Sequence, residues 1–181
     1  MNLKTLVKVG NISNLSDARY CAGMGVQILG FNIDPSDPEH ISLDTAREIM
    51  GWVSVDDFVF ECGTMSVDDI LKLKKETGVS FFQIDDASNV SELKNADCKV
   101  ILKDAESTGV HPDYMLLEDQ HNLSSSIPIL RGFEVSTDEL PQILNSKIYS
   151  GIALKGSIEE KPGFKDYDEL ADILEALENE E

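Results

Sequence analysis

Two short segments in the second half of the chain combine a cation with glycine; they comprise Arg131, Gly132, Lys155, Gly156 and Ser157. Guanidinium and ammonium groups bind anions through charge-assisted hydrogen bonds, and glycine lets the backbone approach a ligand closely. The two segments are therefore a candidate site for an anion such as phosphate. The alternative is that both cations form ion pairs with Glu61 and Glu118, in which case protein atoms fill the same space.

The thiols and imidazoles predict neither a disulfide framework nor a metal site. The three cysteines, Cys21, Cys62 and Cys98, are odd in number and far apart, which fits a reducing compartment. No Cys-x-x-Cys pair occurs, and the three histidines lack metal-ligand spacing. Cys62 ends an apolar segment, so it is either a reactive thiol at the end of a strand or a small buried apolar side chain.

Eight short apolar segments rich in β-branched residues predict strands at about 5–10, 27–32, 58–62, 80–84, 99–103, 113–118, 127–131 and 149–154. Helical patterns with Ser or Asn at their starts and Gly at several ends lie between them, at about 14–24, 42–50, 66–77, 88–96, 136–145 and 167–178. Strand–helix alternation over the whole chain predicts a parallel sheet, and eight strands predict a closed (β/α)8, or TIM, barrel.

The barrel is expected to be reduced, because 181 residues are fewer than this fold usually needs. Only residues 104–112 separate the fifth and sixth predicted strands, and only 119–126 separate the sixth and seventh. A parallel crossover with its helix needs about 10–12 residues. We therefore expect one domain over residues 1–181, with the helix between strands 6 and 7 shortened or missing, and the one between strands 5 and 6 reduced as well.

Several motifs occur in a consistent order along the chain. Residues 8–18 read Lys-Val-Gly-Asn-Ile-Ser-Asn-Leu-Ser-Asp-Ala, and residues 25–31 read Gly-Val-Gln-Ile-Leu-Gly-Phe. Ala-Arg-Glu-Ile follows at 46–49, Ile-Leu-Arg-Gly-Phe-Glu at 129–134, and a segment containing Glu-Glu-Lys-Pro-Gly-Phe-Lys-Asp ends at 166. In order and spacing these motifs resemble the phosphoribosylanthranilate isomerase family of tryptophan biosynthesis.

The resemblance implies a TIM barrel and an isomerase that uses no metal and no cofactor. The family reaction is the Amadori rearrangement of N-(5-phosphoribosyl)anthranilate. A carboxylic acid protonates the ring oxygen and a cysteine thiolate removes the proton at C2. Backbone amides after the last two strands hold the phosphate, and an arginine after the second strand helps to hold the anthranilate carboxylate.

At most of the positions that carry these roles, this chain has a different residue. Gly10 stands at the position of the catalytic cysteine, and glycine has no group that can accept a proton. Glu118, followed by Asp119, stands at the position of the catalytic acid. Glu39 stands at the position of the arginine, so a carboxylate that repels the anthranilate carboxylate replaces a cation that attracts it. The glycines of the candidate anion site lie where the family binds phosphate.

We therefore expect a family barrel with weak or absent isomerase activity that still binds a small phosphorylated ligand. The first alternative is an active isomerase that uses Glu118 or Asp119 as the acid and Cys62 as the base. The second is a non-catalytic interaction protein, in which the barrel wall exposed by the missing helix contacts a partner.

The amino-acid composition limits the kinds of partner that the protein is expected to bind. The formal net charge is −19 at pH 7 and the pI is near 4.3, so the surface repels nucleic acids and anionic membranes. No run of residues is apolar and long enough for a signal core or a membrane span. We expect a cytoplasmic protein whose compatible partners are a small phosphorylated or anionic ligand and a second copy of the chain in a homodimer.

Overall fold

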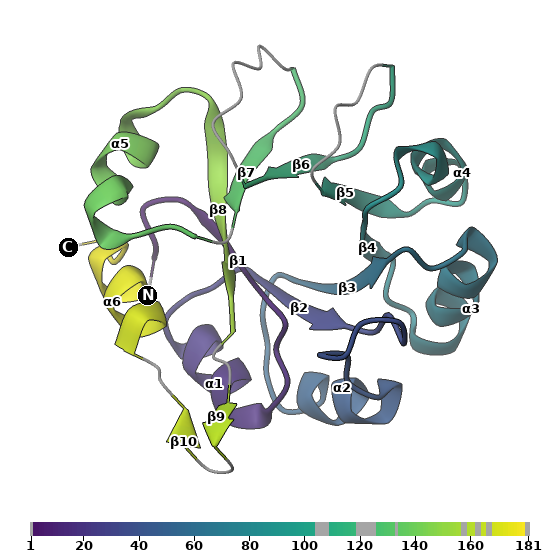
Figure 1. Cartoon of the computed structure of the whole chain (residues 1–181), viewed down its shortest axis with the longest axis horizontal. Helices are drawn as coiled ribbons and strands as arrows, with labels where there is room; N and C mark the ends of the chain where they lie inside the picture. The colour runs from purple at the N-terminus through teal and green to yellow at the C-terminus, as the bar shows by residue number, and fades with distance from the viewer. Residues whose placement is uncertain are drawn as a thin grey trace.

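The computed structural model of the chain describes residues 2–103, 109–118, 126–132, 134–156, 159–161, 164–165 and 168–179. Eight parallel strands close into a barrel in which β1 pairs with both β2 and β8 (Figure 1). The strands are β1 (Leu6–Gly10), β2 (Ile28–Asn32), β3 (Asp57–Gly63), β4 (Phe81–Ile84), β5 (Lys99–Lys103), β6 (Tyr114–Leu117), β7 (Ile129–Gly132) and β8 (Tyr149–Lys155). The predicted TIM barrel is confirmed.

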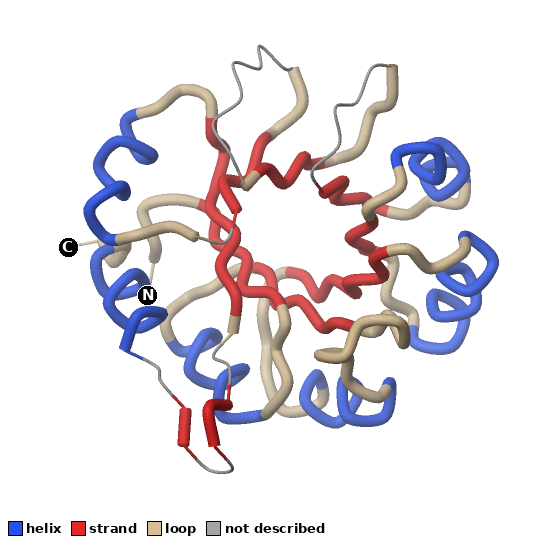
Figure 2. Tube along the Cα trace, in the orientation of Figure 1, coloured by secondary structure: helices blue, strands red, loops and turns tan. Residues whose placement is uncertain are grey.

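The helices lie outside the barrel on every side except the one next to β6, where the described residues form no helix, as Figure 2 shows. They are α1 (Leu15–Gly23), α2 (Leu43–Met50), α3 (Val67–Thr77), α4 (Val90–Asn95), α5 (Leu140–Asn145) and α6 (Asp168–Ala176), with short 3₁₀ turns η1 (Ala87–Asn89) and η2 (Thr137–Glu139). The described parts of the two short crossovers, 109–113, 118 and 126–128, contain no helix. An unexpected hairpin, β9 (Glu159–Lys161) and β10 (Phe164–Lys165), follows β8.

The helix starts follow the capping signals of the sequence. The side chains of Asn14, Ser42 and Ser66 accept hydrogen bonds from backbone N–H groups three residues later, at 3.0, 3.1 and 3.2 Å. Such caps satisfy amides that a first helical turn leaves unpaired. Helix α3 ends at Gly78, whose φ of 77° suits glycine. None of the described helices is both long and apolar enough to cross a bilayer.

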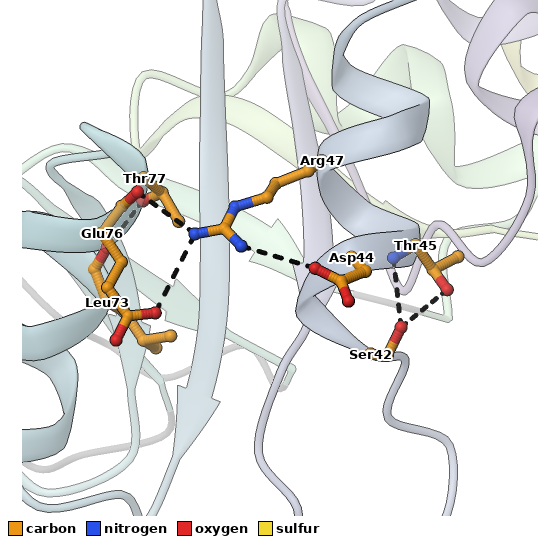
Figure 3. A network of polar contacts seen from close by, with 7 residues as sticks. All are labelled: Ser42, Asp44, Thr45, Arg47, Leu73, Glu76 and Thr77. Carbon is orange, nitrogen blue, oxygen red and sulfur yellow. Dashed lines mark hydrogen bonds and ion pairs between the residues drawn. The ribbon is translucent and has the colours of Figure 1, made fainter.

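One arginine joins two neighbouring helices of the outer layer (Figure 3). From α2, Arg47 donates through Nη2 to the carbonyl oxygen of Glu76 in the last turn of α3, at 3.1 Å. Its Nη1 lies 3.4 Å from Asp44 Oδ1 on its own helix. A cation at the C-terminal end of a helix also complements the helix dipole.

The barrel interior has an apolar layer that one charged residue interrupts. Its buried members are Ile28, Val59, Phe81, Ile101, Leu116, Leu130 and Ala153, one from each strand except β1. At this level β1 supplies Lys8, which pairs with Ile28 on one side and Ala153 on the other. Lys8 is fully buried. A buried ammonium needs a partner, and the partner lies above it at the carboxyl ends of the strands.

The outer wall of β6 and β7 is not the exposed patch that the interaction-protein alternative requires. Outward-facing Met115, Leu117 and Ile129 are only 3%, 4% and 2% exposed. Among the described residues, the large apolar side chains that are exposed are Trp52 and Ile148. Trp52 follows α2, and Ile148 lies between α5 and β8.

The contact between β1 and β8 gives a test of the barrel closure. A Cβ at Gly151 would lie 2.5 Å from the Leu6 carbonyl oxygen and 2.9 Å from its Cβ. We therefore expect Gly151→Ala to lower the free energy of unfolding by about 1–3 kcal/mol, measured by urea denaturation. Gly23→Ala, at the end of α1 with nothing within 4 Å of the added carbon, is the control and should be neutral or stabilising. Equal stability of both variants would contradict this packing.

Candidate functional site

A cavity of about 410 Å³ opens at the carboxyl ends of the strands, on the side of β1 to β5. Its lining is predominantly polar: Gly10, Asn11, Asn32, Asp34, Ser36, Asp37, Pro38, Glu39, Glu61, Gly63, Thr64, Gln83, Asp85, Lys103 and Lys155. In barrels of this type the loops at these strand ends carry the functional groups. The cavity is therefore the candidate functional site.

The floor of the cavity is an ion pair between Lys8 and Glu61. Lys8 Nζ contacts Glu61 Oε1, and their side chains are 0% and 12% exposed. The second oxygen, Oε2, accepts a hydrogen bond from the Asn11 N–H at 2.8 Å. Asn11 adopts a left-handed φ of 54°, a conformation that asparagine tolerates better than most residues. The carboxylate of Glu61 is thus held from β1 and from the turn that follows it.

The ion pair occupies the space that side chains at positions 10 and 30 would need. A Cβ at Gly10 would collide with Glu61 Oε1 and lie 2.8 Å from Lys8 Nζ. A Cβ at Gly30 would lie 2.8 Å from the same oxygen and 3.0 Å from Gly10 Cα. Gly10, where the resemblance places a catalytic cysteine, therefore has no room for a thiol while Glu61 stays in place.

The loop after β2 brings further carboxylates to the rim. Glu39, at the position of the family's arginine, is exposed and accepts a hydrogen bond from Asn11 Nδ2 at 3.1 Å. Asp34 is buried and accepts hydrogen bonds from the N–H groups of Ser36 and Thr64 at 2.9 and 3.0 Å. Burial opposes ionisation of Asp34, but the hydrogen bonds from Ser36 and Thr64 outweigh it and lower its pKa.

The acid position lies beside this cavity, next to Lys103, which lines it. Glu118 is exposed, 3.7 Å from Lys103 Nζ through Oε1, and it is not among the lining residues. Asp119 lies outside the described residues, so the acid role assigned to either carboxylate stays a prediction.

Two residues of the candidate anion site already donate hydrogen bonds to backbone carbonyl oxygens of the protein. Buried Arg131 donates through Nη1 to the backbone carbonyl oxygens of Glu118 and Gly132. The Gly156 N–H donates to the carbonyl oxygen of Gly10 at 2.7 Å. Lys155 is exposed and lines the cavity, and Ser157 lies outside the described residues. The expected partner of Glu61 was Arg131 or Lys155; the ion pair instead uses Lys8.

Cys62 faces away from the cavity. It is fully buried, packs with the residues between strands and helices, and donates to the Phe60 carbonyl oxygen at 3.6 Å. Its neighbour Glu61 takes the inward-facing position of the strand. Burial, followed by the nearby charges of Asp34 and Glu61, raises the pKa of the Cys62 thiol far above its usual range.

Sequence reasoning missed several residues of the candidate site, and two of them, Lys8 and Gln83, lie within strands. Both are polar side chains within otherwise apolar strands, and both are at least nine-tenths buried. That interruption is the signal that could have identified them, because strands of a parallel barrel are normally apolar throughout.

The ion pair can be tested by a double-mutant cycle. Glu61→Ala leaves the ammonium of Lys8 buried without its partner, so we expect a loss of about 3–5 kcal/mol in the free energy of unfolding. Lys8→Met combined with Glu61→Ala should lose less than Glu61→Ala alone, and urea denaturation would measure both. The exposed pair Lys72–Asp69, 2.8 Å apart, is the matched control and should show almost no coupling. Additive effects at Lys8 and Glu61 would contradict the interaction.

The cysteines give an independent test. Burial raises the pKa of Cys21 to about 12, and it also raises those of Cys62 and Cys98. Because the thiolate is the reactive form, we expect all three native thiols to react slowly with iodoacetamide at neutral pH. Guanidinium should release all three for rapid reaction, as counted by mass spectrometry. Rapid labelling of native Cys62 would instead indicate access from the cavity.

The chain is similar to known proteins both in sequence and in structure. No protein-family model matches the chain. It is 25% identical to N-(5'-phosphoribosyl)anthranilate isomerase of Maridesulfovibrio salexigens over 97% of this chain and 99% of the relative. It is 21% identical to the isomerase of the same name from Sulfurihydrogenibium, over 96% and 99% of the two chains. The crystal structure of phosphoribosyl anthranilate isomerase from Thermus thermophilus superposes with a TM-score of 0.78 at 18% identity, covering 95% of this chain and 98% of the other. Sequence similarity over nearly the full length of both chains, the shared barrel fold and the motif order support membership of this chain in the phosphoribosylanthranilate isomerase family.

Proposed function

We propose that this chain is a family barrel that has lost isomerase activity at ordinary enzyme rates and acts as a small-molecule-binding protein. The observation that carries the proposal is the Glu61 carboxylate, which Lys8 and Asn11 hold directly against Gly10. No thiolate fits at that position while Glu61 lies there, and the two oxygens of the Glu61 carboxylate are already bonded to Lys8 and to the Asn11 N–H. A positioned proton acceptor contributes about 10²–10⁴-fold to a rate, so replacing a free thiolate by an ion-paired carboxylate should be costly.

The charge of the cavity also opposes the family substrate. The relatives are named for N-(5'-phosphoribosyl)anthranilate, which carries a phosphate and a carboxylate. Five carboxylates and two ammonium groups line the cavity. At an effective dielectric constant near 20, two like charges about 4 Å apart repel by about 4 kcal/mol. Glu39 brings such a charge to the position where the family uses an arginine.

Retention of a small phosphorylated ligand is the weaker candidate. Lys103 and Lys155 line the cavity and favour it. Against it, the Gly156 amide and one guanidinium nitrogen of Arg131 are already bonded to backbone carbonyl oxygens. These bonds would have to break before the Gly156 N–H or Arg131 Nη1 could bind an anion.

The active-isomerase alternative needs a base at the mouth of the barrel. Cys62 would have to turn from the helix side of β3 to the cavity side, where Glu61 already lies. Its thiol would also have to ionise despite a strongly raised pKa. These observations weigh against Cys62 as the base.

The proposal is tested by assaying the purified chain for isomerisation of N-(5'-phosphoribosyl)anthranilate, with the Maridesulfovibrio salexigens protein as the positive control. We expect no turnover above background, and none in Gly10→Cys, because the new thiol collides with Glu61. Turnover of about 1–10³ per second would overturn the proposal. If such activity also fell in Cys62→Ala, the active-isomerase alternative would be correct.

A further inference from the structure

One residue of the candidate site binds both the floor and the rim of the cavity. The Asn11 N–H donates to Glu61 Oε2 at 2.8 Å, and the Asn11 side chain donates through Nδ2 to Glu39 Oε2 at 3.1 Å. Glu61 belongs to the buried ion pair, whereas Glu39 is exposed on the loop after β2. Asn11 is therefore the point at which the floor of the cavity is joined to a loop that lines its mouth.

The backbone on either side of Asn11 is held in place by the barrel. The Gly10 carbonyl oxygen accepts a hydrogen bond from the Gly156 N–H at 2.7 Å, and the Ile12 N–H donates to the Gly30 carbonyl oxygen at 2.9 Å. Between these two bonds, Asn11 has a left-handed φ of 54°. Backbone hydrogen bonds to other parts of the barrel restrict local motion, so Asn11 offers its side-chain amide from a fixed position.

The loop between β2 and α2 is anchored at its base. It comprises residues 33–41, and its two ends meet where the Ile41 N–H donates to the Asn32 carbonyl oxygen at 2.9 Å. Near its start, the buried carboxylate of Asp34 accepts a hydrogen bond from the Thr64 N–H at 3.0 Å. The base of the loop is thus fixed both to the end of β2 and to the turn that follows β3.

The tip of this loop, residues 37–40, is a compact unit. Asp37 accepts the Glu39 N–H through Oδ1 at 2.8 Å and the His40 N–H through its carbonyl oxygen at 3.1 Å. Within the described part of the chain, the bond between Asn11 and Glu39 is the one hydrogen bond that joins the tip to residues outside the loop. Asp37 and Glu39 also line the cavity, so movement of the tip changes the shape of the mouth.

We propose that residues 37–40 form a flap at the mouth of the cavity and that the Asn11 side chain is the catch that holds the flap in place. A single exposed hydrogen bond favours the closed flap by about two- to tenfold, so the flap opens often. Segments that move to admit a ligand are typically those of low local stability. The inference does not rest on the proposed function, since a flap can serve binding with or without turnover.

The experiment is amide hydrogen exchange of the full chain, followed at His40 by ¹H–¹⁵N NMR. Asn11→Gly removes the catch but keeps the backbone N–H that binds Glu61, because glycine readily adopts a left-handed φ. We expect the protection factor of the His40 N–H to fall by about two- to tenfold. The Ser36 N–H, which donates to Asp34 Oδ1 at 2.9 Å near the base of the loop, is the internal reference and should keep its native protection.

Changes at the other partner separate the catch from a general loosening of the loop. Glu39→Ala, at an exposed position, should lower the protection of His40 as much as Asn11→Gly does, and the double variant should lower it no further. Glu39→Gln is the matched control, because its amide oxygen can still accept from Asn11, so its effect should be smaller than that of Glu39→Ala. Native protection of His40 in both single variants, additive effects in the double variant, or an equal loss of protection at Ser36 would overturn the proposal.

A second measurement tests whether loosening the tip opens the cavity. A neutral, water-soluble nitroxide should broaden the amide signals of Gly63 and Gln83, which line the cavity, more strongly in Asn11→Gly than in the native chain. Lower protection at His40 without this extra broadening would mean that the tip does not cover the cavity, and the flap would be wrong. Neither measurement involves turnover, so failure of the flap leaves the proposed function standing, and isomerase turnover would leave the flap standing.

Discussion

A single ion pair inside the barrel determines the shape of the mouth. Lys8 places an ammonium where the other seven strands place apolar side chains, and Glu61 turns inward to meet it. Two glycines, Gly10 and Gly30, leave room for the carboxylate, and the Asn11 amide binds its far oxygen. A buried charge without its partner is costly, so none of these positions can vary independently of the ion pair.

Below the mouth, the fold is assembled from ordinary elements. Capped helices, apolar strands and a parallel ladder give a barrel like that of isomerases at 18% identity. Barrel folds separate stability from chemistry, because the strands and helices form the core while the loops at one end carry the site. Gly10 and Glu39 lie at or beyond the strand ends of this chain, so the residues at these two positions leave the apolar core of the barrel in place.

Much of the fold could be predicted from sequence, because local patterns determine it. Capping residues, terminal glycines and short apolar segments located the strands and most helices to within about two residues. The helix predicted from 136 begins instead with the 3₁₀ turn η2, and α5 follows from Leu140. The altered residues Gly10 and Glu39 were also visible. The partner of Glu61 was not, because strand register and side-chain direction decide which cation meets it. Gln83 was missed for the same reason, since its unpaired oxygen becomes apparent only when all its neighbours are in place.

The interlocked mouth limits which single substitutions the protein can tolerate. A cysteine at position 10 needs the space that the Glu61 side chain occupies. Loss of Glu61 leaves the Lys8 ammonium without its carboxylate, and loss of Lys8 leaves the carboxylate without its cation. Each of these single substitutions is therefore unfavourable, although several made together need not be. With Lys8 and Glu61 paired over Gly10, residues around the ion pair can therefore change far more easily than the residues that form it.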